Sequence, residues 1–185
     1  MLSRDERQGR VLVVDDMGNW HDTLALVFEQ EDCCVECVHN ISEAEKAVAQ
    51  RSFDLIVLDI RLSDEQPRNE GIQFLQHIRT LGDETEVVIF TAYPDVQTVH
   101  EALKDLGARD YLIKNPEGGF DEISLKRFRE VTREAIAVSR ARNAASDSDY
   151  GAILLVEDDD RWVEVLSDAL LSEGYTVDST REFKQ

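Results

Sequence analysis

The chain has 185 residues, 42% of them hydrophobic and 32% charged, which is typical of a folded globular protein and excludes a disordered one. Its formal net charge of −19 predicts a surface that repels phosphate backbones, so we expect no nucleic-acid binding by this chain. The apolar runs are too short to span a bilayer, and no stretch near Met1 has the layout of a signal peptide. We therefore expect a cytoplasmic protein without membrane contact.

Short apolar runs alternate with helical patterns over most of the chain. The predicted strands are residues 11–14, 33–38, 55–58, 87–90 and 111–113. Between them apolar residues recur at helical spacing, and Ser42 with Glu45 has the pattern of a capping box that opens the second helix. Gly107 is placed to end the fourth helix, and a long fifth helix is predicted from about Ile123 to Ala144. This alternation predicts an α/β protein with a parallel sheet covered on both faces.

The three cysteines, Cys33, Cys34 and Cys37, all fall on the predicted second strand. An odd number of cysteines in a cytoplasmic chain argues against a disulfide framework. Cys34 and Cys37 have the spacing of a metal or redox pair, but residues three apart on a strand point to opposite faces. We therefore expect these residues to be small buried hydrophobes rather than metal ligands.

Polar side chains follow four of the five predicted strands directly. Asp15 and Asp16 follow the first strand, and Asp59 follows the third. Thr91 follows the fourth and Lys114 the fifth. Functional groups of open parallel sheets collect at the carboxyl ends of the strands. The sequence therefore predicts three carboxylates, one hydroxyl and one ammonium at a single edge of the sheet.

This set of groups suits phosphoryl transfer. Clustered carboxylates repel one another unless a cation lies among them, and ligand sets made only of oxygen suit Mg²⁺. A carboxylate can attack phosphorus to give an acyl phosphate, and phosphoryl transfer depends mainly on positioning and charge neutralisation. Each residue alone has a simpler interpretation, as a helix cap, a turn residue or a surface lysine. The ordered set favours the phosphoryl-transfer interpretation.

These residues resemble the receiver domain of response regulators in two-component signalling. The matching stretches are VLVVDD at 11–16, DLIVLDIRL at 54–62, VVIFTAY at 87–93 and GARDYLIK at 107–114. The resemblance covers about residues 9 to 140. It implies a flavodoxin-like doubly wound sheet of five parallel strands in the order 2-1-3-4-5, with a receiver domain at residues 9–122 and an extended fifth helix and linker at 123–148.

The resemblance also implies roles for the strand-end residues. Asp15 and Asp16 correspond to metal-binding acids, Asp59 to the phosphorylated aspartate, and the backbone carbonyl of Arg61 to a further ligand of Mg²⁺. Two positions depart from the family pattern: Asn115 stands between Lys114 and the following proline, and the loop at residues 63–70 is longer than usual.

The remaining site residues correspond to groups that bind the phosphoryl group or respond to it. Thr91 and Lys114 match the residues that hold it, and Thr91 with Tyr111 matches the pair that switches the surface of the fourth helix, fifth strand and fifth helix. Arg61 and Tyr93 stand two residues beyond Asp59 and Thr91, at positions that tune the lifetime of the phosphate.

We therefore expect a response regulator that takes a phosphoryl group from a histidine kinase or histidine phosphotransfer protein onto Asp59, with self-catalysed transfer and autodephosphorylation, and is not a conventional enzyme. One alternative is an Mg²⁺-dependent aspartate-nucleophile phosphatase of the haloacid dehalogenase type. That class needs an acid two residues after the nucleophile, where this chain has Arg61, or Met17 after Asp15. Another alternative is a vestigial receiver that acts as a scaffold. The downstream effector is not encoded in a visible motif.

Residues 153–180 repeat residues 11–38 at a constant spacing. Identical pairs are Leu12 and Leu154, Val14 and Val156, Asp16 and Asp158, Trp20 and Trp162, Leu24 and Leu166, Glu31 and Glu173, and Val35 and Val177. Paired tryptophans in register indicate duplication. We expect residues 150–185 to form an incomplete second receiver, namely its first strand, helix and second strand with Glu157 and Asp158 as the acidic pair. A longer tandem protein would then be expected.

The predicted fifth helix carries a short apolar seam. It consists of Phe128, Val131, Ala135 and Val138, at heptad-like spacing. This seam suggests a homodimer formed through the long helix.

Overall fold

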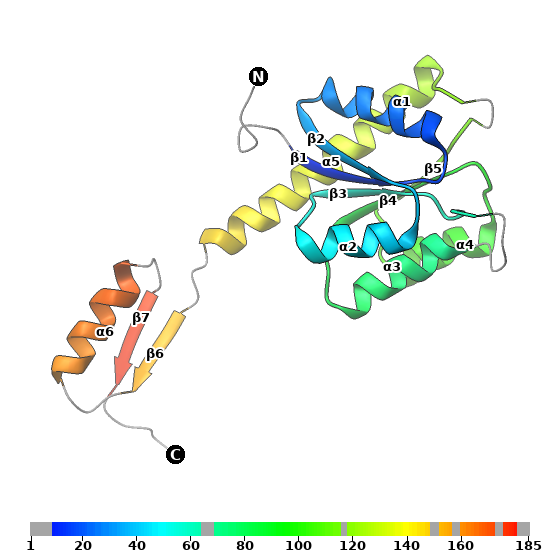
Figure 1. The fold of residues 1–185 in the computed structure, drawn as a ribbon. Helices are drawn as coiled ribbons and strands as arrows, with labels where there is room; N and C mark the ends of the chain where they lie inside the picture. Colours follow the sequence, from blue (N-terminus) through cyan, green and yellow to red (C-terminus); the bar gives the residue numbers. More distant parts are fainter. Residues whose placement is uncertain are drawn as a thin grey trace. The chain divides into compact units, whose positions relative to one another are not determined.

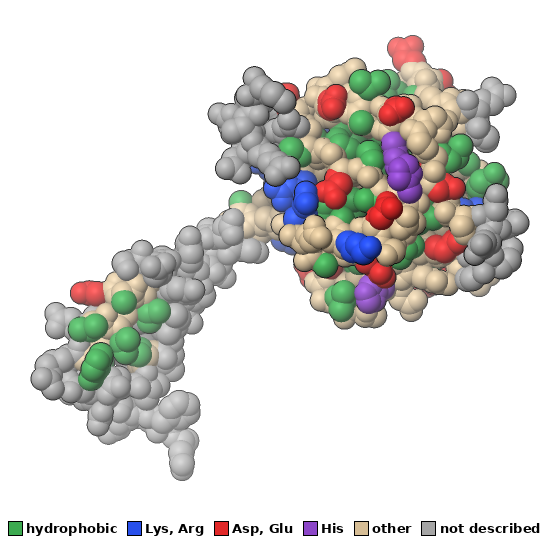
Figure 2. Space-filling model, in the orientation of Figure 1, with side chains coloured by type: hydrophobic (Ala, Val, Ile, Leu, Met, Phe, Trp, Pro, Cys, Tyr) green, Lys and Arg blue, Asp and Glu red, His purple; other side chains and the backbone are tan. Residues whose placement is uncertain are grey.

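The computed structural model describes residues 9–63, 69–115, 118–148, 152–156, 160–172 and 176–180. The chain forms two compact units, residues 1–140 and residues 141–185. None of the described helices is long and apolar enough to cross a membrane. Figure 2 shows aspartate and glutamate side chains scattered over the visible face of the first unit, so many of the acids serve as solvated surface.

The first unit alternates strands with helices in the predicted order (Figure 1). The strands are β1 (Gly9–Val14), β2 (Cys33–Val38), β3 (Leu55–Leu58), β4 (Glu86–Thr91) and β5 (Asp110–Ile113). The helices are α1 (Gly18–Glu29), α2 (Ile41–Gln50), α3 (Glu70–Thr80), α4 (Val96–His100), which continues into the π-helical turn η1 (Glu101–Asp105), and α5 (Glu122–Ser148). All five strands are parallel, in the order β2-β1-β3-β4-β5. The predicted fold is confirmed.

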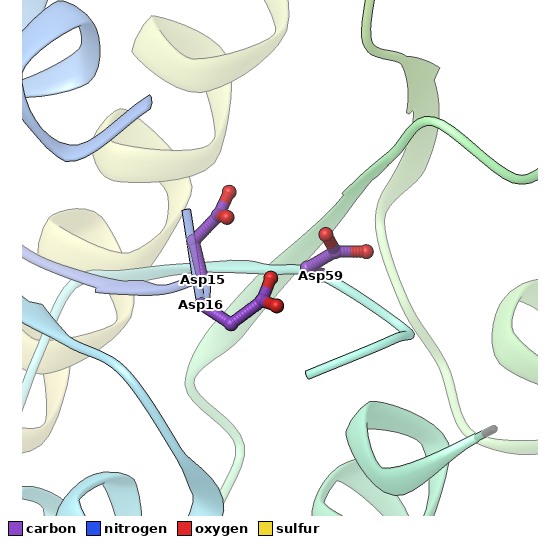
Figure 3. A group of neighbouring side chains, drawn as sticks. All are labelled: Asp15, Asp16 and Asp59. Atoms are coloured by element: carbon purple, nitrogen blue, oxygen red, sulfur yellow. The ribbon is translucent and has the colours of Figure 1, made fainter. Parts of the chain in front are cut away.

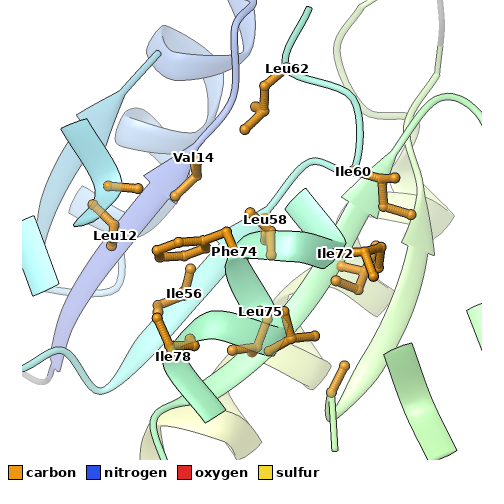
Figure 4. Packing of buried hydrophobic residues seen from close by; sticks show 14 of the residues in the cluster. Leu12, Val14, Ile56, Leu58, Ile60, Leu62, Ile72, Phe74, Leu75 and Ile78 are labelled. Carbon is orange, nitrogen blue, oxygen red and sulfur yellow. The ribbon is translucent and has the colours of Figure 1, made fainter. Parts of the chain in front are cut away.

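Each face of the sheet has its own core because alternate strand residues point to opposite faces. Leu12 and Val14 of β1 pack with residues of α2 and α3, among them Phe74 (Figure 4). Val11 and Val13 pack on the other face with residues of α1 and α5. We call these two clusters the α2/α3 core and the α1/α5 core. Figure 1 shows α1 and α5 on one side of the sheet and α2, α3 and α4 on the other.

The start of α2 differs from the prediction. Asn40, not Ser42, is the N-cap, and its side-chain oxygen accepts a hydrogen bond from the backbone N–H of Glu43 at 3.0 Å. The Glu43 carboxylate in turn accepts from the backbone N–H of His39 at 2.9 Å, which completes a reciprocal capping pair. The helix begins earlier because Ile41, in its first turn, packs against the α2/α3 core.

The predicted dimer seam on the fifth helix is wrong. Phe128, Val131 and Ala135 are buried in the α1/α5 core, with exposed fractions of 1%, 3% and 0%. Only Val138 of the four seam residues is exposed, at 43%. The heptad-like spacing therefore arises from packing on the sheet of the first unit itself rather than from a surface for a second copy.

The three cysteines are free thiols, but only Cys33 is buried as predicted, whereas Cys34 and Cys37 are half-buried. Cys33 and Cys37 pack on the α1 side of the sheet, and the alternation of the strand directs Cys34 to the other side. Burial raises the pKa of both Cys33 and Cys37 to about 11, so these thiols stay protonated and unreactive near neutral pH.

The second unit contains β6 (Ala152–Val156), α6 (Asp160–Ser172) and β7 (Thr176–Thr180), with the two strands parallel. Its strand register runs from Ala152 opposite Thr176 to Val156 opposite Thr180, which is the register of β1 and β2 at the repeat spacing. Figure 2 shows hydrophobic side chains gathered over α6. Among the large hydrophobic residues described there, Trp162 is 57% exposed, Val165 58% and Leu166 37%.

Candidate functional site

The carboxyl ends of β1 and β3 bring three acids together. Each of Asp15, Asp16 and Asp59 offers one carboxylate oxygen, and these three oxygens lie within 4.8 Å of one another (Figure 3). Asp15 and Asp59 are buried, whereas Asp16 is exposed at the rim. Backbone hydrogen bonds continue the sheet beyond the strands, because the N–H of Asp59 donates to the carbonyl of Val14 at 2.9 Å. The two strand ends therefore hold the acids in fixed relative positions.

Lys114 connects two of these acids from β5. Its ammonium nitrogen lies 2.5 Å from Asp15 Oδ2 and 2.5 Å from Asp59 Oδ2, and the side chain is fully buried. The backbone N–H of Lys114 donates to the carbonyl of Thr91 at 2.9 Å, which fixes the base of the side chain. One ammonium cannot balance three carboxylates, so this cluster retains negative charge and favours a bound cation.

The second oxygen of each buried acid is also held. The backbone N–H of Met17 donates to Asp15 Oδ1 at 3.0 Å, and the backbone N–H of Arg61 donates to Asp59 Oδ1 at 3.2 Å. Each carboxylate thus accepts from its own following turn through Oδ1 and from Lys114 through Oδ2. Sequence reasoning did not predict these two backbone donors. Almost every Asp is followed two residues later by a backbone N–H, so the sequence does not show which Asp accepts a hydrogen bond from it.

Burial raises the pKa of Asp15 above its usual range. The nearby Lys114 ammonium and the Met17 N–H oppose this shift, and the negative charge of Asp59 adds to it. Without a cation, the folded protein therefore holds a proton on Asp15 more tightly than the unfolded chain does.

Thr91, Arg61 and Tyr93 lie around the same edge of the sheet. Thr91 is fully buried, and its hydroxyl oxygen accepts from the backbone N–H of Tyr93 at 3.4 Å. The guanidinium carbon of Arg61 lies 4.2 Å from the centroid of the Tyr93 ring, in cation–π contact. The Arg61–Tyr93 stack therefore links the segment after β3 to the segment after β4, although the Tyr93 side chain is 62% exposed.

Tyr111 on β5 is partly buried and packs against the α2/α3 core. Burial raises the pKa of its hydroxyl to about 12, and the charges of Asp59 and Asp95 add to the shift. The Tyr111 phenol therefore stays neutral. Pro116, which the sequence analysis singled out after Lys114, lies outside the described residues.

An aromatic cluster lies beneath Lys114. The ring of Phe90 lies 5.6 Å from the Lys114 ammonium and 4.9 Å from the ring of Trp20, edge to face. Phe120, in the segment after β5, contacts Trp20 at 5.2 Å and Phe90 at 5.6 Å. Sequence analysis did not single out Phe90 or Phe120, although Phe90 directly precedes Thr91, and an aromatic residue at that position was a usable signal. These rings exclude water from below the ammonium and strengthen its interaction with the acids.

The chain matches the family model of the response regulator receiver domain over residues 11–120. It belongs to the response regulator receiver domain family. Among curated relatives, the regulatory protein AtoC of Escherichia coli is 34% identical over 116 residues, and AlgB of Pseudomonas putida, an alginate biosynthesis transcriptional regulatory protein, is 33% identical over 114 residues. These alignments cover 63% and 62% of this chain but only 24% of each relative, so the chain spans about a quarter of the length of the curated relatives it matches.

Solved structures of receivers have the same fold. NtrX from Brucella abortus, solved in complex with ADP, aligns with a TM-score of 0.61 and 26% identity over 75% of this chain and 29% of that chain. The signal receiver domain of a putative LuxO repressor protein from Vibrio parahaemolyticus aligns with a TM-score of 0.63 and 20% identity, over 74% of this chain and 96% of that domain. The second of these comparisons shows the fold alone.

Asp15→Asn should stabilise the metal-free receiver at neutral pH. Folding raises the pKa of Asp15 from its ordinary value of 3.8. As the pH rises above 3.8 and through the pKa of the folded state, the folded protein must bury the charged carboxylate, which lowers its stability. In buffer with EDTA we expect the variant to melt above the wild-type chain at pH 7, and the difference to shrink toward pH 4.

Asp121→Asn provides a control of opposite sign. Backbone and side-chain hydrogen bonds from Ser124 lower the Asp121 pKa, so the stability from its charged form is present at neutral pH and is lost on acidification. This variant should melt below the wild-type chain at pH 7 and approach it at low pH. Equal melting temperatures of wild type and Asp15→Asn across the range would contradict the buried-charge argument.

Proposed function

We propose that this receiver accepts a phosphoryl group on Asp59, with Mg²⁺, from a histidine kinase or a histidine phosphotransfer protein, and that phosphorylation changes its interactions with a partner. The observation that carries this proposal is the buried Lys114 ammonium placed between Asp15 and Asp59, with Asp16 at the rim. Family membership makes a signalling role the natural context for these groups.

The donor set fits Mg²⁺. Three carboxylates converge, with one ligand oxygen from each within 4.8 Å of the others, and the exposed rim at Asp16 gives water and a phosphate oxygen access to the ion. Asp15, Asp16, Asp59 and the backbone carbonyl of Arg61 would hold the metal. When bound, Mg²⁺ would neutralise the acids and the negative charge of the incoming phosphoryl group.

The protein groups then have distinct tasks. A carboxylate oxygen of Asp59 attacks phosphorus, the phosphorus–nitrogen bond of the phosphohistidine breaks, and its electron pair leaves with the donor imidazole. Lys114 is already beside Asp59 and can shift its ammonium to a phosphoryl oxygen, while the Thr91 hydroxyl donates to another. The acyl phosphate later loses its phosphoryl group to water, so the domain catalyses its own transfer and hydrolysis without a conventional turnover.

The switch would involve Thr91 and Tyr111. When the Thr91 hydroxyl turns toward the phosphoryl group, it gives up its long contact with the Tyr93 N–H. Tyr111 lies on the neighbouring strand, partly buried against the α2/α3 core, where a change at Thr91 can alter its packing. We propose that this change in the packing of Tyr111 couples phosphorylation to the surface formed by α4, β5 and α5.

Asp59→Asn should abolish phosphorylation. With radiolabelled acetyl phosphate and Mg²⁺, we expect acid-stable, base-labile label on the wild-type chain, and no label above background on this variant or in EDTA. Asp105→Asn, which changes an exposed acid away from the site, should label like wild type.

Each other result has a defined meaning. Label that persists in Asp59→Asn would move the acceptor elsewhere. Sustained hydrolysis of p-nitrophenyl phosphate would favour the aspartate-nucleophile phosphatase. Failure of the wild-type chain to bind Mg²⁺ or beryllofluoride would favour the vestigial scaffold.

The Arg61–Tyr93 stack should lengthen the life of the phosphoryl group. It bridges the two segments that flank Asp59 and Thr91 and can limit the approach of water to the acyl phosphate. Arg61→Met and Tyr93→Leu should each speed loss of label by roughly three- to tenfold, in keeping with a cation–π contact of about 1 kcal/mol.

A double-mutant cycle tests whether the two side chains act as a pair. The double variant should lose label no faster than the faster single variant, because either change already breaks the stack. Tyr93→Phe keeps the ring and should keep the wild-type lifetime. Multiplicative effects of the two single changes would show that the residues act separately.

We also propose that residues 150–185 are the first strand, helix and second strand of a second receiver. The register of β6 and β7 equals that of β1 and β2. Trp20 and Leu24 of α1 are buried, with exposed fractions of 1% and 0%, whereas their equivalents Trp162 and Leu166 are exposed. Among the described residues, this face of α6 is therefore exposed where the equivalent face of α1 is covered. The domain boundaries at 122 and 150 remain predictions.

A graft tests this equivalence. Replacing residues 11–38 of the first unit by residues 153–180 should give a chain that melts cooperatively, with the transplanted Trp162 protected from acrylamide. The control graft uses residues 152–179, since a slip of one residue turns every strand side chain to the wrong face. If both grafts fail to melt cooperatively, or both fold equally well, the second unit is not a receiver fragment.

A further inference from the structure

Gly71, the second residue of α3, lies directly against the backbone of the proposed acceptor. A methyl carbon built on Gly71 would lie 2.1 Å from the carbonyl oxygen of Asp59 and 2.9 Å from the Cα of Ile60. These distances are far below van der Waals contact, and both neighbours are backbone atoms that cannot rotate away. Only a residue without a side chain fits here.

Helical preference does not explain this glycine, because glycine is less favourable than alanine inside a helix. Gly18 provides the comparison, since it also lies in the first turn of a helix, α1, and a methyl carbon there would have no atom within 4 Å. Gly18 could therefore be alanine at no steric cost. Gly71 could not, and the difference lies entirely in its contact with Asp59 and Ile60.

The backbone around Asp59 is held from two sides. On one side the Asp59 N–H donates to the carbonyl of Val14 in β1 at 2.9 Å. On the other side the Gly71 N–H donates to the carbonyl of Ile60 at 3.0 Å. Ile60 and Ile72, the neighbours of this contact, are 4% and 2% exposed, so the first turn of α3 packs into the α2/α3 core beside the acceptor.

We propose that Gly71 is a positioning residue for phosphorylation: its missing side chain lets α3 press against the Asp59 backbone and hold the acceptor at its distance from Lys114 and Asp15. This inference rests on the proposed function and extends it. It also implies that α3 and Asp59 behave as one rigid body.

A side chain at position 71 would displace the Asp59 carbonyl by roughly 1 Å. The Asp59 carboxylate is bonded to Lys114 at 2.5 Å and to the Arg61 N–H at 3.2 Å, so it would lose this alignment. A misplacement of about 1 Å at a reacting group can slow a reaction by about 100-fold. The cost of the substitution should therefore fall on the rate of phosphoryl transfer.

The test compares Gly71→Ala with Gly18→Ala and Ile78→Val in the full chain. Ile78 lies in the last turn of α3 with 1% exposure, so its truncation lowers stability without touching Asp59. Labelling rates are measured with acetyl phosphate at saturating Mg²⁺, at a temperature where every variant is folded. We expect Gly71→Ala to label at least tenfold more slowly, and both controls to label within twofold of wild type. A Gly71→Ala rate within twofold of wild type would overturn the positioning role.

A second measurement uses the wild-type chain and does not depend on the folding of any variant. Hydrogen exchange of the Gly71 amide, which reports its bond to Ile60, should remain as slow or become slower when beryllofluoride and Mg²⁺ bind. Faster exchange would overturn the rigid-body role. If the wild-type chain itself neither labelled nor bound beryllofluoride, the proposed function would fall and the positioning role with it, whereas normal labelling of Gly71→Ala would overturn the positioning role alone.

Discussion

The first unit is organised around one buried ammonium shared by two buried carboxylates. A fully buried lysine is stable only if its charge is met at close range, and Lys114 is met by Asp15 and Asp59 from two other strands. The three strand ends must therefore be aligned, which requires the register of the parallel sheet to hold across β1, β3, β4 and β5. The same arrangement leaves excess negative charge at the rim, where a cation can enter. The chemistry at this edge thus depends on the same contact, while the buried charge of Asp15 costs the metal-free protein stability.

The two faces of the sheet support this contact in different ways. Below Lys114, on the α1/α5 side, Trp20, Phe90, Phe120 and Phe128 form a continuous aromatic cluster. Flat rings have few rotamers and exclude water, so the surface that they form beneath the ammonium is rigid and apolar. The other face is packed mainly with aliphatic side chains of α2 and α3. The aromatic side holds the lysine, while the aliphatic side holds the backbone that carries the acceptor.

Sequence reasoning succeeded where one local signal determined the outcome. The strands at residues 33–38 and 55–58 were predicted to the residue, because each run of strand-forming side chains is bounded by polar or turn-forming ones. The three acids were predicted to converge because parallel strands end at one edge.

Sequence reasoning failed where the outcome depended on which part of the fold packs against a residue. Asn40 and Ser42 are both good caps, and the packing of Ile41 decided between them. The apolar seam of α5 was read correctly as an apolar face but assigned to the wrong partner. Nothing in the sequence separates Gly71 from Gly18, since only the space around each glycine differs.

The α1/α5 core also constrains the order in which the receiver can be completed during synthesis. Val11, Trp20 and Leu24 emerge first from the ribosome, but they are covered partly by Phe128 and Ile136, which are made more than 100 residues later. The α2/α3 core draws on earlier segments and can close sooner. The nascent chain must therefore carry an uncovered aromatic face until α5 is released, so the docking of α5 is the step that ends its exposure to aggregation.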